Sequence, residues 1–195
     1  ASFNRTNLIL SVQRDRNRKE ALLTFVQNHH DQAGIIYCNT RKEVDKIWDM
    51  LRRAGIQAVR YHGGMEDWER NENQDCFLKE KANLIVATNA FGMGINKPDV
   101  RYVVHYNLPK NIESYYQEIG RAGRDGLPSL CVLFFSYSDV HINRYLLEQN
   151  SKNEERLEFE LGKLEDMVQY ASASSCLRQY ILQYFGETAK STCNA

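Results

Sequence analysis

The 195-residue sequence contains no G-x-x-x-x-G-K-[ST] segment, so it carries no phosphate-binding loop of its own. It also has no excess of either charge, because 25 Lys and Arg residues balance 25 Asp and Glu residues. No net field therefore attracts nucleic acid to the whole surface, and any anion site must be local. No apolar run approaches the ~18 residues that span a membrane, and no apolar signal segment opens the chain. We expect a globular intracellular protein that does not contact membranes.

Disulfide bonds are also not expected. The chain has five cysteines, and an odd number without a signal segment favours reduced thiols. Cys38, Cys76 and Cys131 fall within strand or helix patterns. We expect these three to be buried small apolar side chains.

Strand-like apolar runs alternate with helical patterns as far as about residue 136. The runs lie at residues 8–12, 34–38, 58–61, 83–88, 101–106 and 130–135. Helical periodicity separates them, which predicts an α/β fold with a mostly parallel sheet and helices on both faces. After residue 136 no strand pattern remains, and three helical segments follow. We therefore predict two domains, at residues 1–136 and 137–195.

The segment Q-E-I-G-R-A-G-R-D-G at residues 117–126 sets Arg121 and Arg124 three positions apart. Arginine is always charged, and its fork of donors suits phosphate oxygens. An isolated R-x-x-R is more often a surface turn whose ion pairs contribute about 0–1 kcal/mol each. The pattern alone leaves both explanations open.

Four segments, taken in order, resemble motifs of the RecQ family of superfamily 2 DNA helicases. They are I-I-Y-C-N-T-R at 35–41, Y-H-G-G-M at 61–65, A-T-N-A-F-G-M-G-I-N-K-P-D-V-R at 87–101, and Y-Q-E-I-G-R-A-G-R-D-G at 116–126. The whole chain resembles the second RecA-like motor domain of such an enzyme, followed by the start of its zinc-binding domain. Residues 3–7 resemble a family segment that usually has proline where this chain has Thr6.

The resemblance implies a nucleotide site shared with another domain. Arg124 corresponds to the arginine finger, worth about 10³–10⁵ in rate, and Arg121 to a second phosphate or coupling arginine. Gln117 would link the nucleotide state to domain closure, while Asn96 would face the ribose. Gly94 belongs to the same loop, where a simple backbone bend explains it equally well. ATP with Mg²⁺ would be held mainly by a first motor domain that this chain lacks.

The resemblance also implies contacts with single-stranded DNA. Arg41, His62, Thr88 and Asn89 correspond to positions that touch the strand's backbone, which fixes position without reading sequence. We expect them at the carboxyl edge of the sheet, together with the arginines. The alternatives are a structural role for His62 and a carboxylate partner on the same helix for Arg41.

Two further cysteines match the zinc-binding domain of the family. Cys176 and Cys193 correspond to the first two of its four zinc ligands, and the sequence ends at Ala195. Structural zinc takes four ligands. We therefore expect an incomplete zinc site here and bound zinc only in a full-length protein.

These expectations describe the C-terminal motor half of an ATP-dependent 3′-to-5′ DNA helicase acting in DNA repair, recombination and replication. Its partners would be single-stranded and duplex DNA and the first RecA-like domain of its own polypeptide. This chain alone should not hydrolyse ATP. We expect a monomer in the bacterial cytoplasm, at the nucleoid, or in a eukaryotic nucleus. The alternatives are another superfamily 2 helicase, including one acting on RNA, and a non-catalytic RecA-like binding module.

Overall fold

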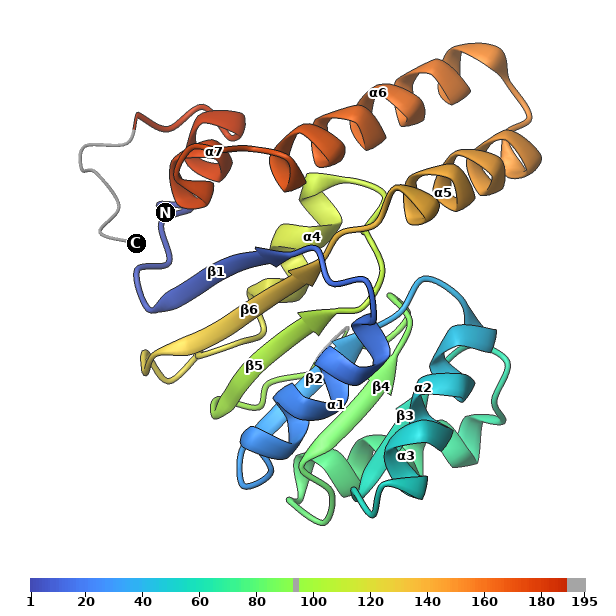
Figure 1. The fold of residues 1–195 in the computed structure, drawn as a ribbon, viewed down its shortest axis with the longest axis vertical. Coiled ribbons are helices and arrows are strands. Elements are labelled where there is room, and N and C mark those ends of the chain that lie inside the picture. Colours follow the sequence, from blue (N-terminus) through green and yellow to red (C-terminus); the bar gives the residue numbers. More distant parts are fainter. Residues whose placement is uncertain (93–94, 189–195) are drawn as a thin grey trace.

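A six-stranded parallel sheet forms the centre of the molecule (Figure 1). The structure is a computed structural model, and it describes residues 1–92 and 95–188. The strand order is β1-β6-β5-β2-β4-β3, and every neighbouring pair is parallel. The strands are β1 Leu8–Gln13, β2 Ala33–Tyr37, β3 Ala58–Tyr61, β4 Leu84–Ala87, β5 Val100–His105 and β6 Ser129–Phe134. The predicted fold class is confirmed.

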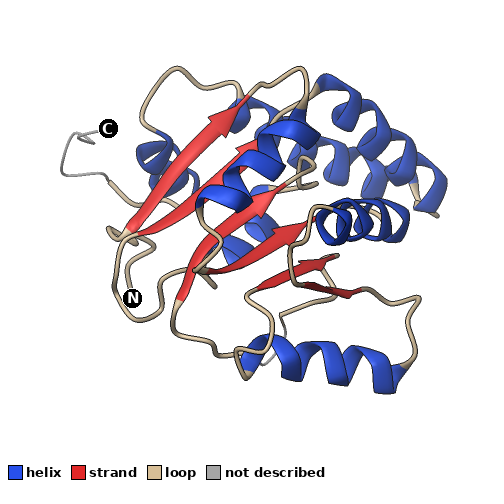
Figure 2. Ribbon diagram, turned by 60° about the horizontal axis from the view of Figure 1, so that its bottom comes forward, coloured by secondary structure: helices blue, strands red, loops and turns tan. Residues whose placement is uncertain are grey.

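Helices cover both faces of this sheet (Figure 2). They are α1 Arg18–Asn28, α2 Arg41–Arg53, α3 Asp67–Leu78 and α4 Ile112–Ile119. Three of them begin at a residue whose side chain accepts a backbone N–H of the first turn, which satisfies a donor that has no partner within the helix. These capping residues are Asn17, Thr40 and Asn111.

The core has one layer on each face of the sheet. Ile35 and Tyr37 of β2 pack into one apolar cluster, whereas Ile36 between them packs into the other. Successive side chains of a strand point to opposite faces, so a strand covered on both sides must be apolar throughout. All five residues of β2 are buried accordingly.

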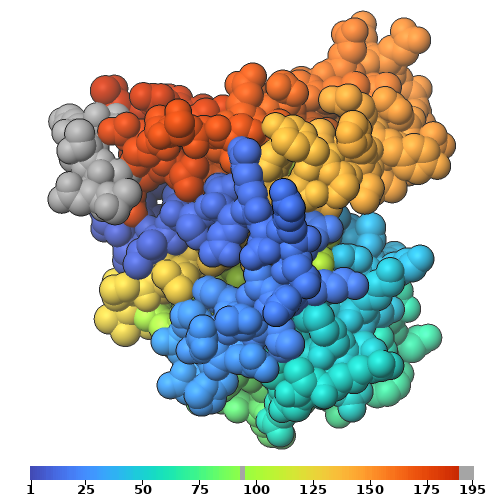
Figure 3. Space-filling view, in the orientation of Figure 1, coloured from blue at the N-terminus to red at the C-terminus, as the bar shows by residue number. Residues whose placement is uncertain are grey.

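The chain continues as helices α5 Tyr137–Asn150, α6 Glu154–Ala171 and α7 Leu177–Tyr184. Figure 3 shows these helices packed against the part of the molecule that contains the sheet. Met167 of α6 and Ile181 of α7 belong to the same apolar cluster as Ile35 of the sheet. The helical part thus shares a core with the sheet, and a division into two domains at residue 137 stays a prediction. None of the helices in the described ranges is long and apolar enough to span a membrane.

The expectation for the cysteines needs one correction. Cys38 and Cys131 are buried, but Cys76 on α3 is only half-buried. Burial raises the pKa of the Cys131 thiol to about 12 and that of Cys38 well above its ordinary value. Cys76 differs because α3 covers an edge region of the sheet, and Phe77 is its only buried residue.

Candidate functional site

The turn that carries Arg121 and Arg124 follows the end of α4 and lies at the amino end of β5. The Gly123 amide donates to the carbonyl of Val100 at 2.8 Å, and the Asp125 amide donates to that of Pro98 at 3.0 Å. The backbone of the turn therefore lies at the amino end of β5 and not at the carboxyl edge, where we expected it, although the Arg121 side chain lies near Tyr37 at the end of β2. A crossover helix returns the chain to the start of the next parallel strand, so its C-terminus reaches the amino edge.

Arg121 is half-buried and lies against the loop that follows β4. Its Nη1 donates to the Gly92 carbonyl, whereas its buried Nε finds no acceptor in the part of the chain that the structure describes. Gly92 has φ +118°, and a Cβ there would overlap the Arg121 guanidinium. Burial raises the pKa of the neighbouring Tyr37, and the charge of Arg121 opposes that rise. The geometry thus depends on glycine at position 92.

Arg124 is exposed and lies beside Asn96. Its Nη1 donates to the Ile95 carbonyl at 2.8 Å and approaches the Asn96 Oδ1 at 3.3 Å. Gln117 is exposed on α4, one helical turn before Arg121. The fold therefore places these predicted nucleotide-contacting residues around one turn. Gly94 lies outside the described residues.

Asp125 fixes the downstream side of this turn. It accepts from Arg101 Nη2 at 2.5 Å and from the Leu127 amide at 3.0 Å. Burial alone would raise the pKa of Asp125, but these hydrogen bonds hold it below its ordinary value. The turn is thus anchored by a carboxylate that stays ionised.

The predicted nucleic-acid contacts lie at the opposite, carboxyl edge. Arg41 begins α2 after β2, His62 follows β3, and Thr88 and Asn89 follow β4. These three strands are neighbours in the order β2-β4-β3, and the Thr88 amide donates to the Tyr61 carbonyl at 3.2 Å. The fold therefore gathers all four residues at one edge.

Within this group, the His62 and Arg41 side chains differ in the partners that they bind. The His62 Nε2 lies 2.9 Å from Asp45 Oδ1, and its Nδ1 accepts the Gly64 amide at 3.0 Å. Both nitrogens of this buried ring are engaged, which fits the structural alternative for His62. Arg41 is exposed beside Gly63, and none of the ion pairs among the described residues involves it. The alternative role of Arg41, a bond to a carboxylate on its own helix, is therefore not seen among the described residues.

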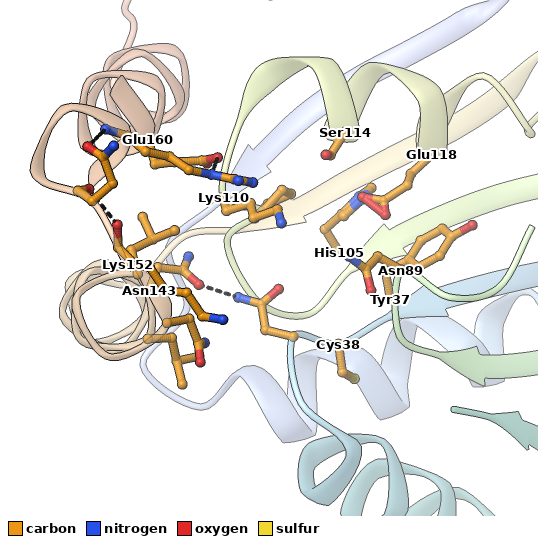
Figure 4. Close-up of a pocket in the computed structure, with 18 residues that line it drawn as sticks. Tyr37, Cys38, Asn89, His105, Lys110, Ser114, Glu118, Asn143, Lys152 and Glu160 are labelled. Carbon is orange, nitrogen blue, oxygen red and sulfur yellow. Dashed lines mark hydrogen bonds and ion pairs between the residues drawn. The ribbon is translucent and has the colours of Figure 1, made fainter. Parts of the chain in front are cut away.

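A hollow of about 710 Å³ opens at the carboxyl edge, between α4 and the α5–α6 hairpin (Figure 4). Asn89 lines it, together with residues that were not among the predicted site residues, including Asn39 and Lys110. His105 and Glu118 form a buried pair on its inner wall, 3.3 Å apart. Asn39 could have been found, because it lies between Cys38 and Arg41 in a segment already linked to the strand.

Side-chain hydrogen bonds tie α5 to this edge. Asn39 Nδ2 donates to Asn143 Oδ1 at 3.1 Å, and Asp139 accepts the Leu108 amide at 3.1 Å. Arg18 Nη1 reaches the same Asp139 at 2.7 Å. The first turn of the helical part is thereby fixed to the strand ends.

Only one of the two predicted zinc ligands lies within the described residues. Cys176 occupies the N-cap position of α7. Across residues 1–92 and 95–188, no group of three or more His, Cys, Asp or Glu side chains could hold a metal. These donors do not make up a four-ligand zinc site. Cys193 lies outside the described residues, so the incomplete site stays a prediction.

Family comparisons cover most of the chain. The helicase conserved C-terminal domain matches residues 17–126, and the RecQ zinc-binding family matches residues 137–195. A DEAD box protein from Methanococcus jannaschii has a similar fold, with TM-score 0.62 and 29% identity over 73% of this chain and 40% of that one.

Curated relatives extend the likeness to nearly every residue. The ATP-dependent DNA helicase RecQ of Bacillus subtilis is 48% identical, over 98% of this chain and 32% of that protein. The RecQ-like DNA helicase BLM of Xenopus laevis is 43% identical, over 95% of this chain and 14% of that protein. A putative ATP-dependent RNA helicase of Acanthamoeba polyphaga mimivirus is also 43% identical, over 100% of this chain and 35% of that protein.

The chain spans about a third of the length of the bacterial relative, 32%. Its motifs, fold and family matches agree along the sequence. The chain therefore belongs to the RecQ family of helicases, of which it comprises the conserved C-terminal helicase domain and the start of the zinc-binding region.

Proposed function

We propose that this chain is the C-terminal motor half of an ATP-dependent 3′-to-5′ DNA helicase. It supplies the arginine finger of the ATP site and half of the single-strand track. The observation that carries the proposal is the exposed Arg124 beside Asn96, on a turn next to the half-buried Arg121. These groups suit a polyphosphate, and the sequence has no phosphate loop to hold one.

In this proposal the nucleotide is shared between domains. The preceding RecA-like domain holds ATP and Mg²⁺, while Arg124 neutralises charge that develops on the γ-phosphoryl group. Arg121 and Gln117 sense the phosphates, and Asn96 contacts the ribose. Loss of the γ-phosphate removes the attraction, so the two domains separate. This chain alone does not hydrolyse ATP.

The single strand lies along the carboxyl edge. Arg41 supplies charge, while Thr88 and Asn89 supply hydroxyl, amide and backbone groups. The segment from Thr88 to Pro98 begins at this edge and ends at the amino edge, where Asp125 binds it. It also contacts Arg121 and Arg124 through Gly92 and Ile95. The segment from Thr88 to Pro98 therefore connects the proposed DNA contacts with the proposed nucleotide contacts.

The test is steady-state ATP hydrolysis by the full-length protein with saturating single-stranded DNA. Arg124→Ala should lower kcat by about 10³-fold or more while KM for ATP changes little. Arg53→Ala is the matched control, because this arginine is exposed and pairs with Asp49 on its own helix. An unchanged kcat in Arg124→Ala would refute the finger assignment.

A second candidate is a helicase acting on RNA, which the description of the mimivirus relative as an RNA helicase favours. Unwinding of matched DNA and RNA duplexes with 3′ or 5′ overhangs distinguishes the two. Our proposal expects DNA duplexes with a 3′ overhang to be opened fastest. A preference for RNA duplexes would replace it with the second candidate.

A further inference from the structure

The N-terminal segment lies against the arginine turn although it is far away in sequence. Arg5 Nη1 donates to the Gly120 carbonyl at 3.2 Å. Its Nη2 donates to the carbonyls of Ala122 at 2.8 Å and Gly123 at 3.1 Å. One guanidinium therefore binds three carbonyls of the turn that carries Arg121 and Arg124.

The Gly120 carbonyl, at the C-cap of α4, needs a partner for a general reason. The last carbonyls of a helix have no donor within it, and a cation near them is favoured by the helix dipole. The guanidinium is planar and rigid, so it fixes the carbonyls relative to one another. Gly120 immediately precedes Arg121, while Ala122 and Gly123 separate it from Arg124. Arg5 thus holds the peptide groups from which both arginines project.

Asn7 extends the same contact. Its Nδ2 donates to the carbonyls of Gly123 at 2.8 Å and Leu127 at 3.0 Å. Gly123 has φ +58°, and a Cβ there would lie 2.5 Å from that Nδ2. The segment and the turn are therefore fitted closely, with no room for a side chain at Gly123.

The segment that carries Arg5 is held in turn by α7. Arg178 donates to the carbonyls of Arg5 at 3.0 Å and Leu8 at 2.6 Å. Phe3 stacks on Phe185 with ring centroids 4.4 Å apart, and its carbonyl accepts the Tyr116 hydroxyl at 3.0 Å. Arg5 is thereby placed by elements on both sides of it.

We propose that Arg5 is a positioning residue for ATP hydrolysis, which sets the direction of Arg121 and Arg124 by binding the carbonyls of Gly120, Ala122 and Gly123. Arg5 itself does not contact the nucleotide. The proposal rests on the proposed function of the two arginines. A misplacement of about 1 Å in a catalytic group can cost 10²-fold in rate, so loss of this contact should be visible in kcat.

The experiment measures kcat and KM for ATP in the full-length protein with Arg5→Ala and Arg5→Lys. We expect Arg5→Ala to lower kcat by about 10²-fold with little change in KM. Arg5→Lys should fall between it and wild type, because a single ammonium cannot span three carbonyls. Val26→Ala, which removes a buried contact of α1 on the other face, is the control for lost stability. A Val26→Ala kcat as low as that of Arg5→Ala would overturn the proposal.

A double-mutant cycle with Arg124→Ala separates positioning from general damage. If Arg5 acts through the arginines, its substitution should lower kcat much less once Arg124 is absent. If the Arg5 substitution lowers kcat by the same factor with and without Arg124, the proposal is overturned. If Arg5→Ala does not fold, Arg5→Lys takes its place in the double-mutant cycle. If Arg124→Ala lowers kcat and the Arg5 variants keep the wild-type value, only the positioning role fails. If Arg124→Ala has no effect, the proposed function fails and this inference fails with it.

Discussion

The two edges of the sheet are held together by different groups. At the amino edge, the two arginines of the turn donate to backbone carbonyls, Arg121 to Gly92 and Arg124 to Ile95. At the carboxyl edge, Asn39 and Asn143 bind each other as well as the Leu108 carbonyl, so side chains also pair with side chains there.

This contrast has a consequence for how each edge responds to substitution. A carbonyl is present whatever the residue, so the amino edge depends on backbone path and therefore on glycine. The carboxyl edge depends on the identity of individual side chains. Each edge should thus be separable from the other by a well-chosen mutation.

Among the substitutions that compare the two edges, the largest effect is expected for Gly92→Ala at the amino edge. A Cβ at this position, where φ is +118°, would overlap the Arg121 guanidinium. In the full-length protein we expect kcat for ATP hydrolysis to fall by about 10²-fold, the loss of one charge-stabilising group. Affinity for single-stranded DNA should remain, as fluorescence anisotropy can show. Gly162→Ala on α6, where a Cβ meets nothing within 4 Å, is the control. Equal loss of DNA affinity would show that the edges are not separable.

A smaller effect, on stability, is expected for Asp139→Ala at the carboxyl edge. Asp139 is 2% exposed and accepts from Arg18 and from the Leu108 amide. Removing it leaves buried donors unpaired, which costs about 1–3 kcal/mol of unfolding free energy. Denaturant unfolding measures this loss, with Asp49→Ala as the exposed control. A loss no larger than that of the control would mean that the network does not fix α5.

The sequence was sufficient for the elements of the fold but not for their long-range contacts. Helical and strand periods located β2 and α2 because both bury regular apolar positions. The edge at which the backbone of the arginine turn lies was predicted wrongly, since the motif says nothing about where a crossover helix ends. Arg5 was missed because its partner carbonyl at Gly120 lies 115 positions away and belongs to the backbone. Such contacts leave no pattern in a single sequence.

Arg41→Ala should weaken DNA binding by a modest factor and leave ATP hydrolysis at saturating DNA almost unchanged. Arg41 is exposed at the carboxyl edge and free of ion pairs among the described residues. Loss of one phosphate contact should reduce the slope of log K against log salt by about 0.7 for a single strand. Titrations at several salt concentrations measure the slope, with Arg53→Ala as control. An unchanged slope would show that Arg41 does not contact a phosphate of the single strand. A fall in kcat would contradict the separation of the two edges.

The smallest effect is expected where the helical part meets α4. Glu113 of α4 accepts from Lys163 of α6 and from the Tyr184 hydroxyl of α7 at 2.7 Å. Burial would raise the pKa of Glu113, but these two hydrogen bonds bring it below its ordinary value. A lowered carboxyl pKa stabilises the folded state above the unfolded pKa, and this contribution is lost as pH falls through the folded value.

We therefore expect Glu113→Gln to be less stable than wild type at pH 7, by at most about 1 kcal/mol because the pair is partly exposed. The difference should shrink as pH falls below about 4.3, the ordinary value for Glu, since wild type then loses the same charge. Thermal unfolding from pH 7 to pH 3 measures this, with Glu158→Gln on the exposed face of α6 as control. A difference that stays constant across this range would mean that shape, and not the charge of Glu113, joins α4 to α6 and α7.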